Sequence, residues 1–176
     1  EEEVSTWPNN GTLGDFVAAD FNGARPVLRL YEKVPGVTFS NAADGLLCAD
    51  PAPAGLLGDS DWSVEVWVYN PFPNGHETAV AWGDRPWNIA EFNIGDDLAF
   101  VSYDNGDLAR QQDPPTGQWV YIAWTHRPAG EAPGDNGAGY IEFYVNGELG
   151  QTGHFPQNPL NVHGTTRSHR SRSAAT

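Results

Sequence analysis

From about residue 60 onward, apolar residues alternate with polar or aromatic ones at a period of two. This alternation is typical of β-strands with one buried and one exposed face, and it does not suit a helix. In the clearest case, WSVEVWVYN (62–70), Val64, Val66 and Val68 would point to one side of a strand. The residues between them would point to the other side: Glu65, Trp67 and Tyr69. A Pro-Phe-Pro sequence follows directly and ends the strand.

Five further segments alternate in the same way and predict strands: TAVAW (78–82), IAEFNI (89–94), LAFVSY (98–103), WVYIAWTH (119–126) and YIEFYVNG (140–147). Turn-forming residues separate them, and Asn146-Gly147 is a strong signal for a two-residue hairpin. Gly (20) and Pro (14) make up 34 of the 176 residues, which is too many for a helical bundle. These strands predict an all-β fold, a two-sheet antiparallel sandwich of the jelly-roll type.

The first 60 residues show this alternation less clearly. VLRLYE (27–32) and GVTFS (36–40) are candidate strands, whereas 42–58 has the composition of a loop. We expect one domain over residues 1–163, followed by a basic tail over 164–176 that has no apolar alternation. The tail carries three arginines that either are solvated or form an interface with an acidic surface: Arg167, Arg170 and Arg172.

The formal net charge of −14 restricts the partners of the chain. A surface with this charge repels nucleic acid, so we expect no nucleic-acid binding. Apolar runs stay well short of the roughly 18 residues that a membrane helix needs, so we expect no membrane insertion. Cys48 is the one cysteine in the sequence, which excludes an intrachain disulfide, and the two leucines before it favour a buried thiol.

Six segments carry motifs in a fixed order: STWPNNGTLGDF (5–16), VTFS (37–40), PAGLLGDSDWSVEVWVYNP (53–71), ETAVAWGDR (77–85), PTGQWVYIAWTHR (115–127) and YVNGEL (144–149). They combine a Trp-rich strand, a Trp-Gly strand end, a Gly-x-Trp strand opener and a Tyr-Val-Asn-Gly hairpin. In this combination, over about residues 5–163, the sequence resembles laminin-G-like modules of the concanavalin A-like lectin/glucanase superfamily, in particular those of large secreted bacterial proteins. The resemblance implies a two-sheet jelly roll and a secreted, extracellular or cell-surface location.

The sequence departs from the pattern of these modules at two places. Trp82-Gly83 is followed by Asp84-Arg85-Pro86-Trp87, where related modules often have Arg and a glycine pair. Beyond Asn161-Val162, where related modules continue with strands that close the sandwich, this sequence turns into the basic tail. The resemblance therefore implies an open sheet edge. Open edges pair with other chains, so a homo-oligomer is among the expected partners.

Members of this superfamily bind sugars on a sheet face or at loop ends. With the valines of 62–70 and the apolar residues of 140–147 inside, the residues facing outward are aromatic rings and carboxylates. The candidate ligand-binding residues are Glu65, Trp67, Tyr69, Glu91, Asn93, Glu142 and Tyr144. The C–H faces of a sugar stack on aromatic rings, and carboxylates accept hydrogen bonds from its hydroxyls. The same residues also suit the ordinary polar face of an amphipathic sheet, so both interpretations stay open.

Glycoside hydrolases place two carboxyl groups across the scissile bond. Laminarinase-type members of the superfamily carry them in a Glu-x-Asp-x-x-Glu pattern. The nearest segment here is EFNIGD (91–96), which has Asn93 in place of the Asp and a glycine before the last acid. We therefore expect no enzymatic activity.

Loops rich in Asp, Asn and Gly supply the oxygen ligands that Ca²⁺ prefers. Calcium sites built from loop oxygens are common in laminin-G-like folds, and Asp104 and Asp107 are the candidate metal ligands here. Any hairpin turn also requires such residues, so we expect no required cofactor and keep Ca²⁺ as an open alternative. The five histidines are scattered and give no zinc pattern.

Three functions remain, in this order. The first is a non-catalytic secreted module that binds carbohydrate or another surface partner and acts in adhesion. The second is a structural subunit that assembles with copies of itself into an extracellular oligomer or filament, through an open sheet edge and the basic tail. The third is a glycoside hydrolase.

Overall fold

The computed structural model describes most of the chain: residues 2–19, 25–40, 44–48, 50–75, 77–84, 88–95, 99–102, 106–109, 115–131, 137, 139–154 and 162. The described residues fall into two compact units, the first built from residues up to Pro51 and the second beginning at Ala52. Their described secondary structure is almost entirely β, with one short 3₁₀ turn, η1 (Ala54–Leu56). The prediction of an all-β fold is confirmed.

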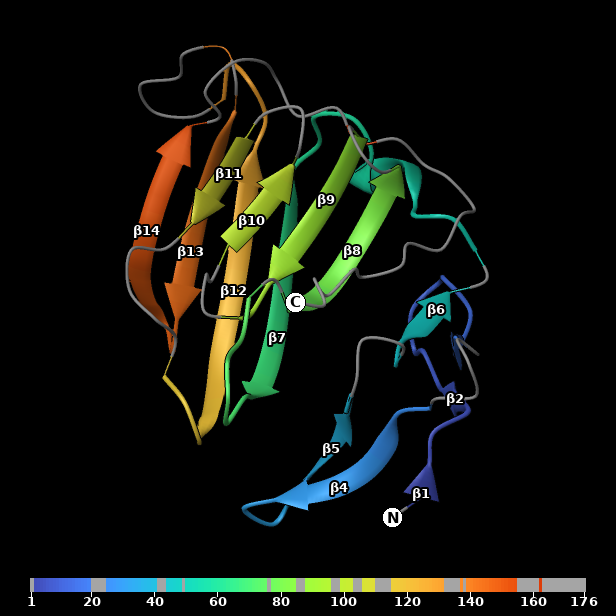
Figure 1. Cartoon of the computed structure of the whole chain (residues 1–176). Coiled ribbons are helices and arrows are strands. Elements are labelled where there is room, and N and C mark those ends of the chain that lie inside the picture. The colour runs from blue at the N-terminus through green and yellow to red at the C-terminus, as the bar shows by residue number, and fades with distance from the viewer. Residues whose placement is uncertain are drawn as a thin grey trace. The chain divides into compact units, whose positions relative to one another are not determined.

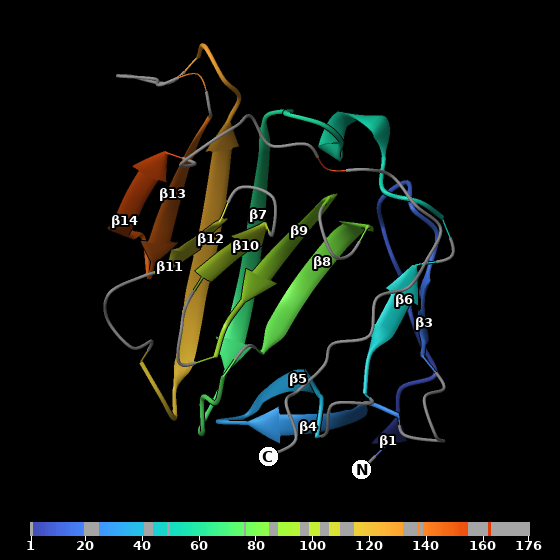
Figure 2. The ribbon, with the colours of Figure 1, turned by 45° about the horizontal axis from the view of Figure 1, so that its top comes forward.

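The second unit holds two antiparallel sheets of four strands each. One sheet has the order β14-β13-β12-β7, with β7 (Trp62–Tyr69), β12 (Trp119–Arg127), β13 (Tyr140–Val145) and β14 (Glu148–His154). The other has the order β11-β10-β9-β8, with β8 (Thr78–Asp84), β9 (Asn88–Asn93), β10 (Ala99–Ser102) and β11 (Gly106–Ala109). Figures 1 and 2 show the second sheet lying over the first, so the two form the layers of a sandwich.

The six strands predicted in this region are all present, with bounds that differ by a residue or two. The segment after the predicted Asn-Gly turn also forms a strand, β14. β11 was not predicted, because Gly106 and its neighbours have the composition of a turn. Instead, Gly106 pairs with Ser102 at the start of a short hairpin strand.

The predicted hairpin at Asn146-Gly147 is confirmed by its backbone. Asn146 has a φ of 52° and Gly147 a φ of 83°, the left-handed pair that matches the twist of a two-residue hairpin. The backbone N–H of Asn146 donates to the Tyr121 carbonyl at 2.8 Å, and the Asn146 Oδ1 accepts from the Tyr121 N–H at 3.0 Å. The turn is therefore tied to β12 as well as joining β13 to β14.

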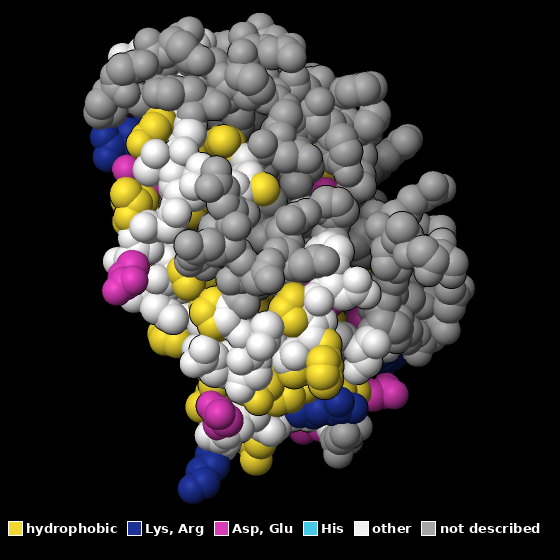
Figure 3. All heavy atoms as spheres, turned by 60° about the vertical axis from the view of Figure 1, so that its left-hand side comes forward, with side chains coloured by type: hydrophobic (Ala, Val, Ile, Leu, Met, Phe, Trp, Pro, Cys, Tyr) yellow, Lys and Arg dark blue, Asp and Glu magenta, His cyan; other side chains and the backbone are white. Residues whose placement is uncertain are grey.

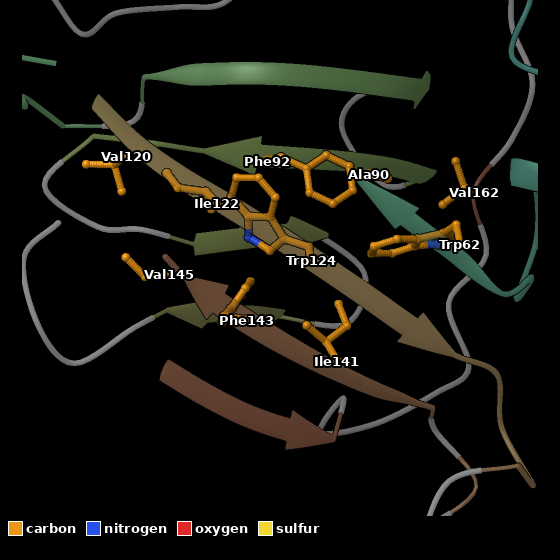
Figure 4. Close-up of a cluster of buried hydrophobic side chains, with 10 residues drawn as sticks. All are labelled: Trp62, Ala90, Phe92, Val120, Ile122, Trp124, Ile141, Phe143, Val145 and Val162. Atoms are coloured by element: carbon orange, nitrogen blue, oxygen red, sulfur yellow. The ribbon is translucent and has the colours of Figure 1, made fainter. Parts of the chain in front are cut away.

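Side chains from both sheets meet between the layers and form the core. The fully buried members come from β9, β12 and β13, as Figure 4 shows, together with Trp62 from β7 and Val162. On β7, Val64, Val66 and Val68 pack against this cluster, while Glu65 and Trp67 are exposed on the opposite side. The predicted division of β7 into an apolar inner side and an outer side with rings and acids is confirmed.

Trp124 lies at the centre of the core. Its ring is edge-on to Phe92 of the facing sheet, with centroids 5.3 Å apart, and to Phe143 of the neighbouring strand at 6.2 Å. Edge-to-face contacts of this kind add stability beyond the burial of apolar area. Trp62 makes a similar contact with Phe92 at 5.1 Å, so tryptophans from two adjacent strands hold the facing sheet.

A histidine, His126, is buried next to Trp62 of the core. The imidazole of His126 stacks on the Trp62 ring at 5.1 Å, and its Nδ1 lies 2.7 Å from the carbonyl oxygen of Ser60. Its Nε2 lies 3.4 Å from Asp59 Oδ1, and Asp59 Oδ2 accepts a hydrogen bond from the Ala129 N–H. Burial lowers the pKa of His126, although the Ser60 carbonyl and the carboxylates of Asp59 and Asp61 act in the opposite direction.

The described residues of the first unit form two small sheets. One has the order β1-β4-β5, with β1 (Glu2–Glu3), β4 (Val27–Tyr31) and β5 (Val34–Thr38). The other has the order β2-β3-β6, with β2 (Thr6–Trp7), β3 (Phe16–Ala18) and β6 (Leu46–Cys48). The strands predicted at 27–32 and 36–40 are confirmed, but the expected loop over 42–58 is wrong at β6 because its residues pair with β3.

The predicted burial of Cys48 is met only in part. The residue is half-buried, and its Sγ donates to the Leu13 carbonyl at 2.7 Å.

One domain over residues 1–163 stays a prediction, and the tail over 164–176 lies outside the described residues. Within the described ranges, no helix is long and apolar enough to cross a membrane.

The depressed pKa of His126 predicts a specific pH dependence of stability. An exposed imidazole has a pKa near 6.5, so the unfolded state takes up this proton first as the pH falls. The free energy of unfolding should therefore be highest above pH 6.5 and decrease as the pH falls from there towards the pKa of the folded state. Urea unfolding at a series of pH values should show this decrease, and His126→Gln should make it shallower. If the free energy of unfolding depended on pH equally steeply in both proteins, His126 would not be the group responsible.

Gly139 lies directly against His126 and Asp59, so a side chain at this position should destabilise the protein. It has a φ of +83°, and an added Cβ would lie 2.9 Å from His126 Nε2 and 3.2 Å from the Arg127 carbonyl oxygen. Gly137 has the same φ, but an added Cβ would meet nothing within 4 Å. In both Ala variants, backbone strain at the positive φ should lower the free energy of unfolding by about 1–2 kcal/mol. In Gly139→Ala, overpacking should lower it by about 1–3 kcal/mol more. If chemical denaturation shows the same decrease in the free energy of unfolding for both variants, the close contact of Gly139 with His126 and Arg127 contributes nothing.

Candidate functional site

The outer side of the β14-β13-β12-β7 sheet gathers aromatic side chains along two paired strands. Trp67 of β7 lies opposite Tyr121 of β12, with ring centroids 5.4 Å apart. Two residues further along, Tyr69 lies opposite Trp119, with ring centroids 5.7 Å apart. We call this surface the ring face, defined by Glu65, Trp67, Tyr69, Trp119, Tyr121, Glu142 and Tyr144.

Trp67 is the most accessible ring of this surface. Its side chain is 64% exposed, which is unusual for a residue with so much apolar area to bury. Tyr69, Trp119 and Tyr121 are half-buried beside it. The rings therefore support one another while leaving contact area open to solvent.

Two carboxylates lie at one end of the ring face, in the two rows that follow the pair Trp67–Tyr121. On β7, Glu65 accepts a hydrogen bond from the Tyr121 hydroxyl, and this bond is the main reason that the pKa of Tyr121 is raised. On β13, Glu142 Oε2 lies 3.2 Å from the Tyr144 hydroxyl and 3.3 Å from Thr125 Oγ1, both of which donate to it. Burial and the Glu142 charge raise the pKa of Tyr144.

These contacts fix the orientation of the polar groups before any ligand arrives. Arg127 approaches Glu142 Oε2 to 4.0 Å and partly balances its charge. Each carboxylate keeps unused lone pairs, because a carboxylate can accept about four hydrogen bonds. The arrangement offers flat apolar rings beside oriented hydrogen-bond acceptors.

The view in Figure 3, from the β14 side, shows a different kind of surface. Hydrophobic side chains of the described residues appear there in small groups among white atoms, which are backbone and other side chains. Leu149 of β14 is 55% exposed, and its backbone pairs with Tyr144 of the ring face. Single exposed apolar residues of this kind are normal on a protein surface.

Five of the seven predicted ligand-binding residues lie on the ring face: Glu65, Trp67, Tyr69, Glu142 and Tyr144. The sequence interpretation missed Trp119 and Tyr121, which complete the ring pairs. The signal was present in WVYIAWTH (119–126), where Trp119 and Tyr121 alternate with the buried Val120 and Ile122. Applying the period of two to this strand as well would have found them.

The other two predicted residues, Glu91 and Asn93, are not exposed. They do point away from the core, because Phe92 between them lies in it, but they are only 2% and 0% exposed. The expectation that they belong to an open outer surface is wrong, since this side of β9 is covered. Thr78 Oγ1 on the neighbouring strand lies 2.7 Å from Glu91 Oε1 and 3.0 Å from Asn93 Oδ1. The three form a buried polar cluster between β8 and β9.

The remaining predicted positions fall outside what can be described. Asp104 lies outside the described residues, as do Arg167, Arg170 and Arg172. Asp107 lies in β11, but its side chain is likewise not described. Among the side chains that are described, no group of three or more His, Cys, Asp or Glu residues comes together in a way that could hold a metal ion.

Residues 42–174 match the sequence model of Laminin_G_3, the concanavalin A-like lectin/glucanases superfamily. The chain belongs to this superfamily. The match covers the whole described second unit, and it confirms the resemblance carried by the sequence motifs.

Among solved structures, the chain is similar to domain 4 of AbnA, a GH43 extracellular arabinanase from Geobacillus stearothermophilus, in complex with arabinotriose. The two share 20% sequence identity with a TM-score of 0.45, over 89% of this chain and 66% of that chain. This chain thus spans slightly less than two thirds of its length. No curated protein matches the sequence.

Proposed function

We propose that this chain is a non-catalytic carbohydrate-binding module that holds its ligand on the ring face. The observation that carries the proposal is Trp67, 64% exposed beside Tyr121 and the Glu65 carboxylate. Membership of a superfamily of lectins and glucanases supports it.

The chemistry of the ring face suits a sugar. An exposed indole offers a flat apolar surface to the C–H groups of one side of a sugar ring. Glu65 and Glu142 then accept hydrogen bonds from hydroxyls at its edge, as polar groups fix orientation in other ligand sites. Because Tyr121, Tyr144 and Thr125 already hold these carboxylates, binding requires little further ordering of the protein.

The placement of the carboxylates supports a non-catalytic role. Glu65 and Glu142 lie on β7 and β13, with β12 between them, and are offset by one row of residues. Strand spacing and rise then separate their backbones by about 12 Å. Each carboxylate is held by different hydroxyl groups, Glu65 by Tyr121 and Glu142 by Tyr144 and Thr125.

We place this module outside the cell, where it would attach to polysaccharide or to a glycan-bearing surface. Ca²⁺ bound by Asp104 and Asp107 remains part of the proposal as a loop-stabilising ion, with oxygen ligands of the type that Ca²⁺ prefers. Binding assays with and without chelator separate this role from sugar binding on the ring face.

A self-assembling structural subunit is the second candidate, favoured by exposed apolar residues of the first unit. Leu30 is 72% exposed and Val34 46% exposed on the β4–β5 hairpin, and β5 is an outer strand of its described sheet. Exposed apolar strand edges pair with other chains. If assembly is the function, sedimentation velocity should show oligomers that Leu30→Lys disrupts. A monomer at both low and high salt would exclude this candidate.

The carbohydrate proposal predicts a selective effect of Trp67→Ala. We expect the variant to bind at least tenfold more weakly, since burying a large apolar side chain contributes about 1.5–3 kcal/mol. The measurement is isothermal titration calorimetry against a panel of soluble polysaccharides: arabinan, xylan, mannan and mixed-linkage β-glucan. The variant should remain folded, because Trp67 is not part of the core.

Trp7→Ala is the matched control, because Trp7 is an exposed tryptophan, 43% accessible, in the other unit. It should bind like the unmodified protein. Equal binding by both variants would show that the ring face is not the site. Failure of the unmodified protein to bind any polysaccharide would overturn the proposal itself.

A further inference from the structure

We infer that the ligand of the ring face is an internal stretch of a linear polysaccharide without acidic groups, which lies along β7 and β12 and continues to Phe72. This inference rests on the proposed function and adds the direction, the length and the charge of the ligand. Its support comes from the row pattern of the sheet, the loop after β7 and the charges beside the rings.

The rings of the ring face succeed one another along the strands rather than forming one compact cluster. The pair Tyr69–Trp119 is followed by Trp67–Tyr121, and Glu65 comes next on the same side of β7. Successive rows on one face of a strand are about 7 Å apart. A ligand that touches every row must therefore extend along the strand direction for several sugar units.

Phe72 lies in the loop directly after β7, at the end of the strand that carries the pair Tyr69–Trp119. Its side chain is 83% exposed, the highest value among the large apolar residues of the described chain. It lies between Pro71 and Pro73, three residues after Tyr69. A ring this exposed between two prolines loses little freedom when a ligand covers it.

Hydrogen bonds hold the loop that carries Phe72. The Phe72 N–H donates to Asn70 Oδ1 at 3.3 Å, while Asn70 Nδ2 donates to Glu77 Oε2 at 2.5 Å. The Asn70 carbonyl accepts from the Gly117 N–H at 3.2 Å, which fastens the loop to the segment before β12. Phe72 is thus held near the end of both strands that carry the ring pairs.

The charges of the ring face disfavour an acidic chain. Its two carboxylates, Glu65 and Glu142, are fixed by hydrogen bonds, and Arg127 is already close to Glu142. The whole protein carries a net charge of −14, so uronic acid or sulfate groups would be repelled. Hydroxyls, in contrast, can donate to both carboxylates without bringing charge.

The test compares oligosaccharides of one to six units from the polysaccharide that binds best in the panel. We expect affinity to rise at least tenfold between two and six units and then to level off. Phe72→Ala should weaken binding of the hexamer about three- to tenfold and leave the dimer unaffected. Phe39→Ala is the matched control, since Phe39 is an exposed phenylalanine, 52% accessible, in the first unit. It should change neither affinity.

The outcomes separate this inference from the proposed function. If a mono- or disaccharide binds as tightly as the hexamer and Phe72→Ala has no effect, the extended ligand is overturned. Sugar binding on the ring face would still be supported if Trp67→Ala lowers the affinity for these short sugars. Tighter binding of polygalacturonate than of every neutral polysaccharide would overturn the ligand without acidic groups. If Trp67→Ala binds normally, the proposed function fails and this inference fails with it.

Discussion

The pairing of β7 with β12 is the interaction on which the rest of the second unit depends. In this register, Val66 lies opposite Ile122 on the core side, and Trp67 lies opposite Tyr121 on the outer side. A slip by one residue would exchange the two sides of the moved strand, since successive side chains of a strand point in opposite directions. The same pairing therefore fixes the core around Trp124 and assembles the ring face. Core and candidate site are two sides of one pair of strands.

The strands of the second unit could be predicted because one physical rule governs them. Residues such as Val64 and Val66 must face the core, and the period of two follows from that requirement. The Asn146-Gly147 hairpin was equally accessible, because only a few residue types adopt its left-handed backbone. β6 and β11 were missed since they are short and their apolar residues do not alternate over a sufficient length. Pairing with a neighbouring strand, which no local pattern reveals, makes them strands.

The candidate site could be predicted only in part, for a related reason. Alternation shows which residues turn away from the core, and this was sufficient for Trp67 and Tyr144. It does not show whether the outward side is open to solvent, which is why Glu91 and Asn93 were placed on a surface although they are buried. Nor does it show which residues of different strands become neighbours. The partnership of Trp67 with Tyr121 depends on the register between segments more than 50 residues apart in the sequence.

The openness of the ring face has a consequence for how strongly a single copy can hold its ligand. In the proposed function, Trp67 would contact the ligand from one side only, because it is exposed on the outer side of a sheet. A contact that leaves the opposite side of the ligand in water gives a modest affinity and permits fast release. Strong attachment then requires many copies of the module acting on one long ligand, where each bound copy raises the effective concentration for the next. A surface of this kind serves repeated, reversible attachment better than permanent capture.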